Sequence, residues 1–152
     1  MPNLFEASIR DVHFGRNVTV INPVNLYECK ISDNAFIGPF VEIQKGVIIG
    51  SNTKIQSHSF ICEKVTIGEN SFVGHGVMFI NDRFSFGGPA GGDPNLWEET
   101  IIGNNVSIGS NVTILPVQIC DNAVIGAGSV VTKSISSPGI YAGNPAKLLR
   151  KI

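Results

Sequence analysis

Aliphatic residues recur at every sixth position along most of the chain. The residues at this spacing are Ile31, Ile37, Ile43, Ile49, Ile55, Ile61, Ile67, Val73 and Phe79. Four positions after each of them up to Val73 lies a second small or β-branched residue, as at Val41 and Val47. A period of six matches neither a plain strand, whose period is 2, nor a helix, whose period is 3.6. The pattern instead predicts short strands joined by tight turns, with each strand on a new flat face.

The repeat predicts an all-β, parallel β-helix of triangular cross-section. Three hexads close one coil, and successive coils stack at the strand spacing of about 4.8 Å. The repeat extends upstream to Phe14 and downstream to Val131, with single-residue deletions after Leu26 and before Ile119. About eighteen hexads, and hence about six coils, fit into a single domain over residues 1–152.

The composition favours many short strands and turns over helices. The chain has 20 Ile and 15 Val but only 6 Leu, together with 17 Gly and 14 Asn. Ile and Val favour strands, whereas Gly and Asn tolerate the positive φ of tight corners. Asn17, Asn105 and Asn111 begin N-x-S/T sequons, and we interpret them as corner asparagines.

Charge and cysteine content narrow the functional classes. A net charge of −1 with 15% charged residues gives no reason to expect nucleic acid or an anionic membrane surface as a partner. The N-terminal segment lacks the apolar stretch of a signal peptide, and no run reaches the ~18 apolar residues of a membrane span. Cys29, Cys62 and Cys120 fit neither metal nor disulfide spacing, so we expect no metal and a cytoplasmic location.

The repeat is interrupted once, by a Gly- and Pro-rich segment over residues 85–100. Loops of this length are usually functional or disordered. The only tryptophan, Trp97, lies near its end and indicates that part of the segment packs. The alternative to a functional loop is a merely tolerated insertion, and the family resemblance described below implies a loop that leaves the prism as a lid over an active site.

The tail over residues 137–152 lies outside the repeat. Asn144 suits a helix N-cap and Pro145 the first helical position, which predicts a short C-terminal helix. Four cations gather near this end, namely Lys133, Lys147, Arg150 and Lys151. They fit either a solvated surface or a binding site for a phosphate-rich ligand.

Stacking arithmetic places the polar candidates, because residues eighteen apart occupy one column on adjacent coils. The pairs so placed are Ser57 with His75, Glu63 with Asn81, and Lys64 with Asp82. We expect these residues and His58 to converge at one edge of two coils, beside the loop. His75, between Gly74 and Gly76, is the first candidate for a general base, since histidine is the usual base near neutral pH. The alternative for both histidines is an exposed strand side chain without a catalytic role.

The pattern [Ile/Val]-Gly-x-x-[Ser/Thr/Val]-x over residues 12–152 resembles the hexapeptide-repeat acyltransferases, whose fold is a left-handed parallel β-helix. The resemblance, not the periodicity, implies the left-handed sense, acetyl-CoA as co-substrate, and a homotrimer with active sites between subunits. The segments 125–133 and 142–147 are similar to the acetyl-CoA end of that family. The implied cofactor-binding residues are Gly109, Ala127, Lys133, Asn144, Lys147 and Arg150.

The strip over residues 72–84, with its core Met-Phe-Ile-Asn-Asp-Arg-Phe, is similar to N-acetyltransferases of nucleotide-linked 3-amino-sugars that supply O-antigens. The resemblance implies that Asn81 and Asp82 lie beside the sugar amine and share the catalytic site with His75. The implied substrate contacts are His58, Glu63, Arg83 and Phe84. Many members continue with Pro-Arg, whereas this chain has Ser-Phe-Gly-Gly over 85–88, which leaves the sugar and the nucleotide, dTDP or UDP, open.

The favoured prediction is acetyl-CoA-dependent N-acetylation of a nucleotide-linked 3-amino-deoxy-sugar, and other functions stay open. An amine of lowered pKa would react without a strong protein base, leaving Asn81 and Asp82 to position it. An O-acetyltransferase of a sugar or serine would use the same fold. A zinc enzyme of the γ-carbonic anhydrase type needs three imidazoles, and only His58 and His75 are expected near each other. A non-catalytic scaffold would bind no acetyl-CoA.

Overall fold

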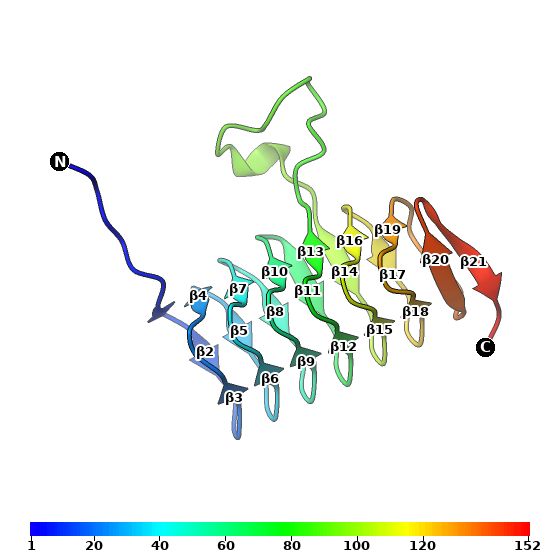
Figure 1. Ribbon diagram of the computed structural model, residues 1–152, viewed down its shortest axis with the longest axis horizontal. Helices are drawn as coiled ribbons and strands as arrows, with labels where there is room; N and C mark the ends of the chain where they lie inside the picture. The colour runs from blue at the N-terminus through cyan, green and yellow to red at the C-terminus, as the bar shows by residue number, and fades with distance from the viewer.

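A computed structural model describes residues 1–152 as a triangular prism of three parallel sheets (Figure 1). Sheet A contains β1 (Ile9–Arg10), β4 (Asn25–Tyr27), β7 (Glu42–Ile43), β10 (Phe60–Ile61), β13 (Met78–Phe79), β16 (Thr113–Ile114) and β19 (Val130–Val131). Sheet B contains β2 (His13–Phe14), β5 (Lys30–Ile31), β8 (Ile48–Ile49), β11 (Val65–Ile67), β14 (Thr100–Ile102) and β17 (Gln118–Ile119). Sheet C contains β3 (Thr19–Val20), β6 (Phe36–Ile37), β9 (Lys54–Ile55), β12 (Phe72–Val73), β15 (Ser107–Ile108), β18 (Val124–Ile125), β20 (Ile140–Gly143) and β21 (Ala146–Arg150).

The strand register confirms the eighteen-residue coil. In sheet A, Ile61 pairs with Ile43, and in sheet C, Val73 pairs with Ile55. Coils on either side of the predicted deletions are one residue shorter, as in the pairing of Ile102 with Ile119. Sheet A has seven strands, so the prism has about seven turns, one more than predicted. The additional turn begins at β1, where Ile9 pairs with Leu26 although the hexad pattern is weak there.

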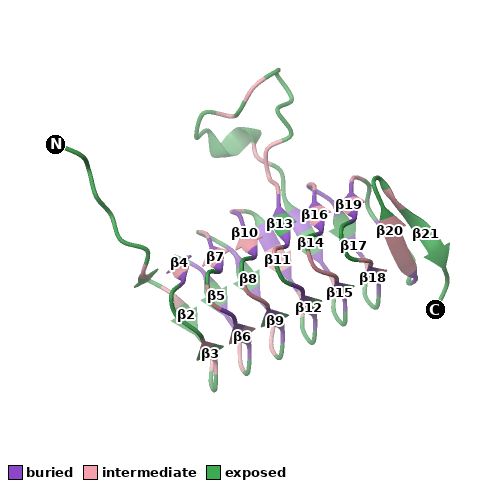
Figure 2. Cartoon of the chain, viewed as in Figure 1, coloured by how far each residue is buried: buried purple, intermediate pink, exposed green.

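The core is one cluster of 29 buried residues, and the buried positions follow the prism from coil to coil (Figure 2). The nine predicted positions from Ile31 to Phe79 are each at most 1% exposed. The second predicted column is also buried, and its Ser and Thr hydroxyls donate hydrogen bonds to backbone carbonyls of the next coil. The Ser59 hydroxyl, for example, donates to the Gly74 carbonyl at 2.8 Å. Sequence periodicity therefore predicted the buried side of the coils from Ile31 onward, whereas Phe14 in the first coils is 39% exposed.

Asparagines occupy left-handed corners, as predicted. Asn17, Asn105 and Asn111 have φ of 54°, 55° and 59°. Asn and Asp side chains tolerate this conformation better than other non-glycine residues do. Neighbouring corner amides also bond to each other, since the Asn52 Nδ2 donates to the Asn70 Oδ1 at 3.1 Å.

The predicted C-terminal helix is wrong, because residues 140–150 form the antiparallel hairpin β20–β21 (Figure 1). β20 extends sheet C beside β18, and the Gly126 amide donates to the Tyr141 carbonyl at 2.8 Å. Pairing with the open edge of sheet C satisfies more backbone groups than the local cap at Asn144 would. Long-range pairing therefore outweighed the local helix signal.

The interruption is a loop of residues 80–99 that projects from the prism between β13 and β14 (Figure 1). Its only regular element is the three-residue 3₁₀ turn η1 (Pro94–Leu96), where the Asp93 carboxylate accepts from the Asn95 amide. No helical segment of this chain has the length and apolar composition needed to cross a lipid bilayer. After the loop, the chain returns to the expected sheet in the expected register, because Val65 of β11 pairs with Thr100 of β14.

Candidate active site

Each hexad advances the chain by one corner of the prism. We call the turns from sheet C to sheet A the histidine corner, because Ser57, His75, Ser110 and Ala127 lie there in one column. We call the turns from sheet A to sheet B the loop corner, because the loop leaves the prism there beside Asn81. The two corners are separated by the width of sheet A.

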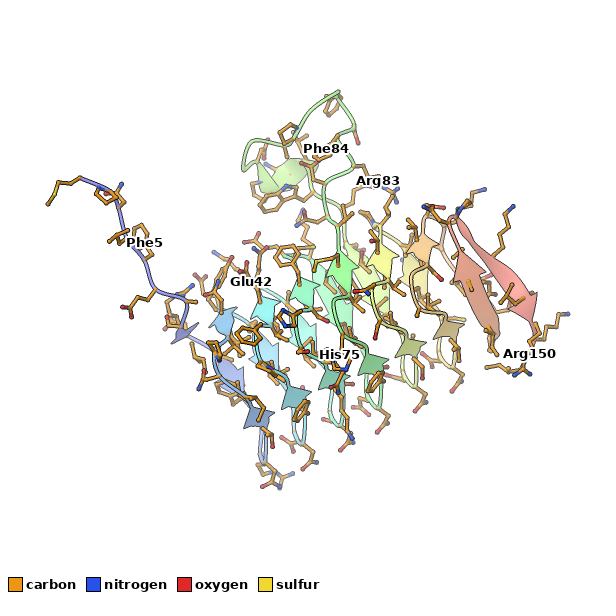
Figure 3. All side chains as sticks on the ribbon, in the orientation of Figure 1. Phe5, Glu42, His75, Arg83, Phe84 and Arg150 are labelled. Atoms are coloured by element: carbon orange, nitrogen blue, oxygen red, sulfur yellow. The ribbon has the colours of Figure 1, made fainter.

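His75 is exposed at the middle of the histidine corner (Figure 3). Its ring Nδ1 lies 2.9 Å from the Ser57 hydroxyl on the preceding coil, as the eighteen-residue spacing predicted. The hydroxyl holds one ring nitrogen, and Nε2 has no partner within the chain. In the tautomer with hydrogen on Nδ1, Nε2 is therefore free to accept a proton.

His58 lies at the same corner but makes a different contact. Its ring stacks on Phe40 with centroids 4.8 Å apart and planes at 21°. The stack holds the imidazole against the preceding coil, so His58 is placed beside the His75 column rather than in it.

Close backbone packing continues the histidine corner toward the C-terminus. A side chain at Gly109 would bring its Cβ within 2.5 Å of the Ala127 nitrogen, so only glycine fits there. The amide groups of His75, Ser110 and Ala127 donate to no group within the chain, and the Ala127 carbonyl accepts from none. The corner thus presents a row of free backbone groups beside His75.

Unpaired cations gather at the C-terminal end of the prism, where Lys147 and Arg150 lie on β21 and Lys133 lies in the turn after β19, at the loop corner. Lys133, Lys147 and Arg150 are exposed and form no ion pair, and Arg150 lies on the terminal hairpin (Figure 3). No Asp or Glu follows Asp121 in the sequence. The end of the prism therefore carries positive charge without local compensation. Asn144 lies in the exposed turn of the same hairpin.

The loop corner is organised by side chains instead. The Asn81 Nδ2 donates to the Glu63 carbonyl at 3.2 Å, which confirms the predicted stacking of these two residues. Both Asp82 oxygens are occupied, because they accept from the amides of Phe84 at 2.9 Å and Ala90 at 2.7 Å. Asp82 therefore folds the base of the loop, a contact that its sequence position did not reveal.

Two cations fasten the loop to the prism. The Lys64 ammonium donates to the carbonyls of Pro94 and of Trp97, the latter at 2.9 Å. Arg83 pairs with Glu98 at 3.0 Å and donates to the Pro116 carbonyl. Lys64 was expected opposite Asp82 and instead reaches the far end of the loop. Because the loop's length has no place in the repeat, sequence spacing could not find these anchors.

An apolar cavity of about 430 Å³ lies under the base of the loop, on the outer side of sheet A. Phe60, Ile80 and Leu115 line it from the sheet, and Phe84 lines it from the loop. Phe60 and Leu115 were not among the site residues predicted from the sequence. Their only signal is that large apolar residues occupy outward positions of neighbouring coils near the insertion.

The expectation that all polar candidates converge at one edge is wrong within one chain. His75, Ser57 and His58 lie at the histidine corner, whereas Asn81, Asp82 and Glu63 lie at the loop corner. Figure 3 shows His75 on the prism and Arg83 and Phe84 apart from it at the loop. The eighteen-residue arithmetic was right for each pair. The two sets differ by six residues, however, and six residues are one full corner.

Three titratable groups with shifted pKa, Tyr27, Cys29 and Cys62, lie toward the N-terminal side of the loop corner. Burial raises the pKa of the Cys29 thiol to about 11 and that of Cys62 to about 12. Burial, followed by the charges of Glu42 and Glu63, raises the pKa of the Tyr27 phenol. These thiols are held protonated and behave as core residues. No group of three His, Cys, Asp or Glu side chains is placed to hold a metal ion.

Comparison with known proteins links the repeat to transferases. The family description "Bacterial transferase hexapeptide (six repeats)" matches residues 28–63, and "Hexapeptide repeat of succinyl-transferase" matches residues 99–133. The bifunctional protein GlmU of Streptococcus uberis is 30% identical over 150 residues, covering 94% of this chain and 32% of that protein. The chain thus spans about a third of the length of the curated relatives it matches.

Two solved structures extend the comparison. A galactoside acetyltransferase in complex with coenzyme A is 35% identical with a TM-score of 0.69, covering 80% of this chain and 64% of that one. A mutant perosamine N-acetyltransferase from Caulobacter crescentus, in complex with CoA and GDP-perosamine, has a TM-score of 0.65 at 18% identity. It covers 93% of this chain and 57% of that one, and at this identity the likeness concerns the fold alone.

Proposed function

We propose that this chain, which belongs to the hexapeptide-repeat family of bacterial transferases, transfers an acetyl group from acetyl-CoA to the amine of a nucleotide-linked 3-amino-deoxy-sugar. The observation that carries the proposal is the histidine corner. One exposed column there combines a hydroxyl-held imidazole, free backbone groups and, at its end, unpaired cations. These are the groups that acyl transfer from a long phosphate-bearing thioester requires.

The thioester substrate fits the corner along its length. The free N–H and C=O of Ala127 suit the amide groups of a pantetheine arm, and the absence of a side chain at Gly109 lets the two coils pack closely beneath it. Lys147 and Arg150 would then face the phosphates from the terminal hairpin, with Asn144 in its turn, and Lys133 would approach them from the loop corner. The similarity to a galactoside acetyltransferase solved with coenzyme A supports this placement.

The proposed reaction breaks the thioester C–S bond and forms an amide C–N bond. The lone pair of the sugar amine attacks the acetyl carbonyl carbon, and His75 Nε2 accepts the proton that the amine loses. The sulfur leaves with the C–S bonding pair, and the proton on His75 returns to it to give the thiol. Ser57 holds the imidazole through Nδ1, and free amides of the same corner are available to the oxyanion.

The acceptor groups are proposed to come from the loop corner of a neighbouring subunit. His75 and Asn81 are six residues apart, so they are at most about 20 Å apart, and the fold places them on different corners. A homotrimer that sets one subunit's loop against the next subunit's histidine corner would unite them. Exposed apolar residues on all three sheets, including Ile48, Phe72 and Met78, support self-association.

The proposed role of the loop corner is to bind and position the acceptor. Asn81 and Asp82 would lie beside the amine, with Glu63, Arg83 and Phe84 around the sugar and His58 beside the reacting centre. The Glu63 carboxylate makes no hydrogen bond or ion pair within the chain, which leaves it free for an ammonium group. We place this reaction in the cytoplasm, in the biosynthesis of a surface polysaccharide such as an O-antigen.

One observation favours a second function, O-acetylation of a sugar hydroxyl. The galactoside acetyltransferase is the more similar of the two compared enzymes in sequence, at 35% against 18% identity. The imidazole at the histidine corner would serve a hydroxyl nucleophile by the same proton transfer.

An acceptor panel tests the proposal and separates the two functions. Thiol release from acetyl-CoA is measured with dTDP-, UDP- and GDP-linked amino-sugars, with the matching hydroxy-sugars, and with free galactosides. We expect turnover with a nucleotide-linked amino-sugar and an acetamide product by mass spectrometry. Turnover only with hydroxylated acceptors would establish O-acetylation instead. A folded protein that neither binds acetyl-CoA nor releases thiol would contradict both functions.

A further inference from the structure

The apolar cavity under the loop has walls from two parts of the chain that the repeat does not link. Phe60, Ile80 and Leu115 come from three successive coils of sheet A, and the Phe84 side comes from the loop. The buried Phe79 lies beneath them. A volume of about 430 Å³ is in the range of small-ligand sites, so the cavity is large enough for a sugar ring.

The polar groups around this cavity are already paired within the chain. Asp82 uses both oxygens on the loop backbone, and the Arg83 guanidinium is bound by Glu98 and the Pro116 carbonyl. Asn81 uses its Nδ2 on the Glu63 carbonyl and keeps its Oδ1 free at the rim. A hydroxyl that enters the cavity loses its water against Phe60, Ile80 and Leu115, whose side chains offer no hydrogen-bond partner.

We propose that this cavity binds the deoxygenated, methyl-bearing edge of the sugar acceptor, and that Phe60, Ile80 and Leu115 select for it. The inference rests on the proposed function and identifies the residues that recognise the acceptor sugar. The free Asn81 Oδ1 lies at the cavity and suits an amino group, and the Glu63 whose carbonyl Asn81 contacts carries an unpaired carboxylate nearby. The neutralised Arg83 makes the cavity a poor phosphate site, which leaves the nucleotide outside it.

The expected selectivity follows from the lining. An apolar pocket discriminates against an added hydroxyl by about 10- to 100-fold, since the hydroxyl must be desolvated. We therefore expect kcat/KM for a nucleotide-linked 3-amino-3,6-dideoxyhexose to exceed that for its 6-hydroxy counterpart by this factor. Both acceptors carry the same nucleotide and the same amino group, so the comparison isolates the methyl against the hydroxymethyl.

The test replaces a wall of the cavity with a polar group of similar length. Leu115→Gln offers a hydrogen-bond partner to the added hydroxyl and should lower the selectivity ratio at least about tenfold. Leu115→Met keeps the wall apolar and should retain the ratio. Leu4→Gln serves as the matched control, because it makes the same substitution at an exposed residue of the segment before β1, away from the cavity. Thermal unfolding of each variant establishes that it is folded.

The outcomes separate this inference from the proposed function. If the wild type acetylates both acceptors equally well, or folded Leu115→Gln keeps the wild-type ratio, the cavity does not select the methyl edge while the transferase function stands. If neither acceptor is turned over, calorimetric binding of the same two compounds decides. A preference in Kd that Leu115→Gln removes would support the cavity without the reaction, and equal or absent binding would overturn the inference.

Discussion

The histidine corner and the loop corner lie on the same coils of one prism, yet different groups of the chain form them. At the histidine corner the chain keeps strict repeat geometry, and the working groups are a ring nitrogen and free backbone amides. At the loop corner the repeat is broken, and side chains such as Lys64, Asp82 and Arg83 hold an irregular segment in place. The regular corner suits a ligand common to a family, whereas the irregular one suits an acceptor that differs between members.

The two corners also differ in how their charges are used. Arg83 and Lys64 are consumed by contacts within the loop corner, so they hold structure. Lys147 and Arg150 at the end of the histidine corner have no partner and remain available to an anion. Counting cations along the sequence could not distinguish these roles, because pairing depends on where the loop folds back.

Removing the imidazole should give the largest effect and would break the histidine corner alone. We expect His75→Ala to lower kcat/KM by about 10²- to 10⁴-fold, because the amine then loses its proton acceptor. His58→Ala, whose ring stacks on Phe40, is the control and should change kcat/KM much less. Steady-state kinetics measure both variants. An unchanged kcat/KM in His75→Ala would mean that the amine reacts without a protein base.

Mixed oligomers test whether the two corners of different subunits form one site. His75→Ala and Asn81→Ala are each expected to be poorly active, and co-expression should restore about a quarter of the wild-type activity in random mixed trimers. The recovered activity comes from interfaces that combine an intact histidine corner with an intact loop corner. Activity no higher than that of the two parents, in oligomers shown to be mixed, would place the whole site within one chain.

Glycine substitutions compare the packing of the two corners. Gly109→Ala should lower the free energy of unfolding by about 1–3 kcal/mol, since its Cβ would press on the backbone nitrogen of Ala127. Gly88→Ala in the loop is the matched control, because a Cβ there meets nothing within 4 Å, and it should stay within about 0.5 kcal/mol. Denaturant unfolding measures both. Equal losses would show that the histidine corner is no more tightly packed than the loop.

Neutralising the terminal cations should affect the donor and leave the acceptor unchanged. The double variant Lys147→Gln with Arg150→Gln should raise KM for acetyl-CoA about tenfold, through the loss of charge-assisted bonds to phosphate. KM for acetyl-pantetheine, which lacks the nucleotide, should not change. Lys30→Gln with Lys54→Gln removes two exposed charges elsewhere and serves as control. Equal effects on both donors would contradict a phosphate contact.

Releasing the loop should have the smallest effect. Lys64→Met removes the bonds to the Pro94 and Trp97 carbonyls, so we expect the acceptor KM to rise a few-fold while unfolding changes by less than about 1 kcal/mol, because Lys64 is exposed. Hydrogen exchange over residues 80–99 should become faster. Lys54→Met, on a strand of sheet C, is the matched control. Unaltered exchange in the loop would show that Lys64 is not its anchor.

The sequence predicted contacts between coils but not contacts around them. The Ser57–His75 pair at 2.9 Å and the Asn81–Glu63 contact at 3.2 Å follow from the eighteen-residue spacing, which fixes what lies above what. The merging of these pairs into one site was wrong, because it ignored that six residues turn the chain by one corner. The C-terminal helix was wrong because the Asn144 cap signal is local, whereas the edge of sheet C that captured β20 is not.

By itself the sequence determined the prism, because a strict aliphatic period of six makes only one side of each short strand apolar, and that side is buried. It also determined many of the turns, because Asn, which tolerates this conformation, occupies seven of the thirteen left-handed non-glycine positions. Others, such as Phe40, His58 and Lys64, take that conformation without such a signal in the sequence. The tertiary structure alone decided how the loop folds onto Lys64 and Asp82 and which apolar residues meet beneath it. These contacts join segments that no period relates, so their energy depends on the folded surface and leaves no regular trace in the chain.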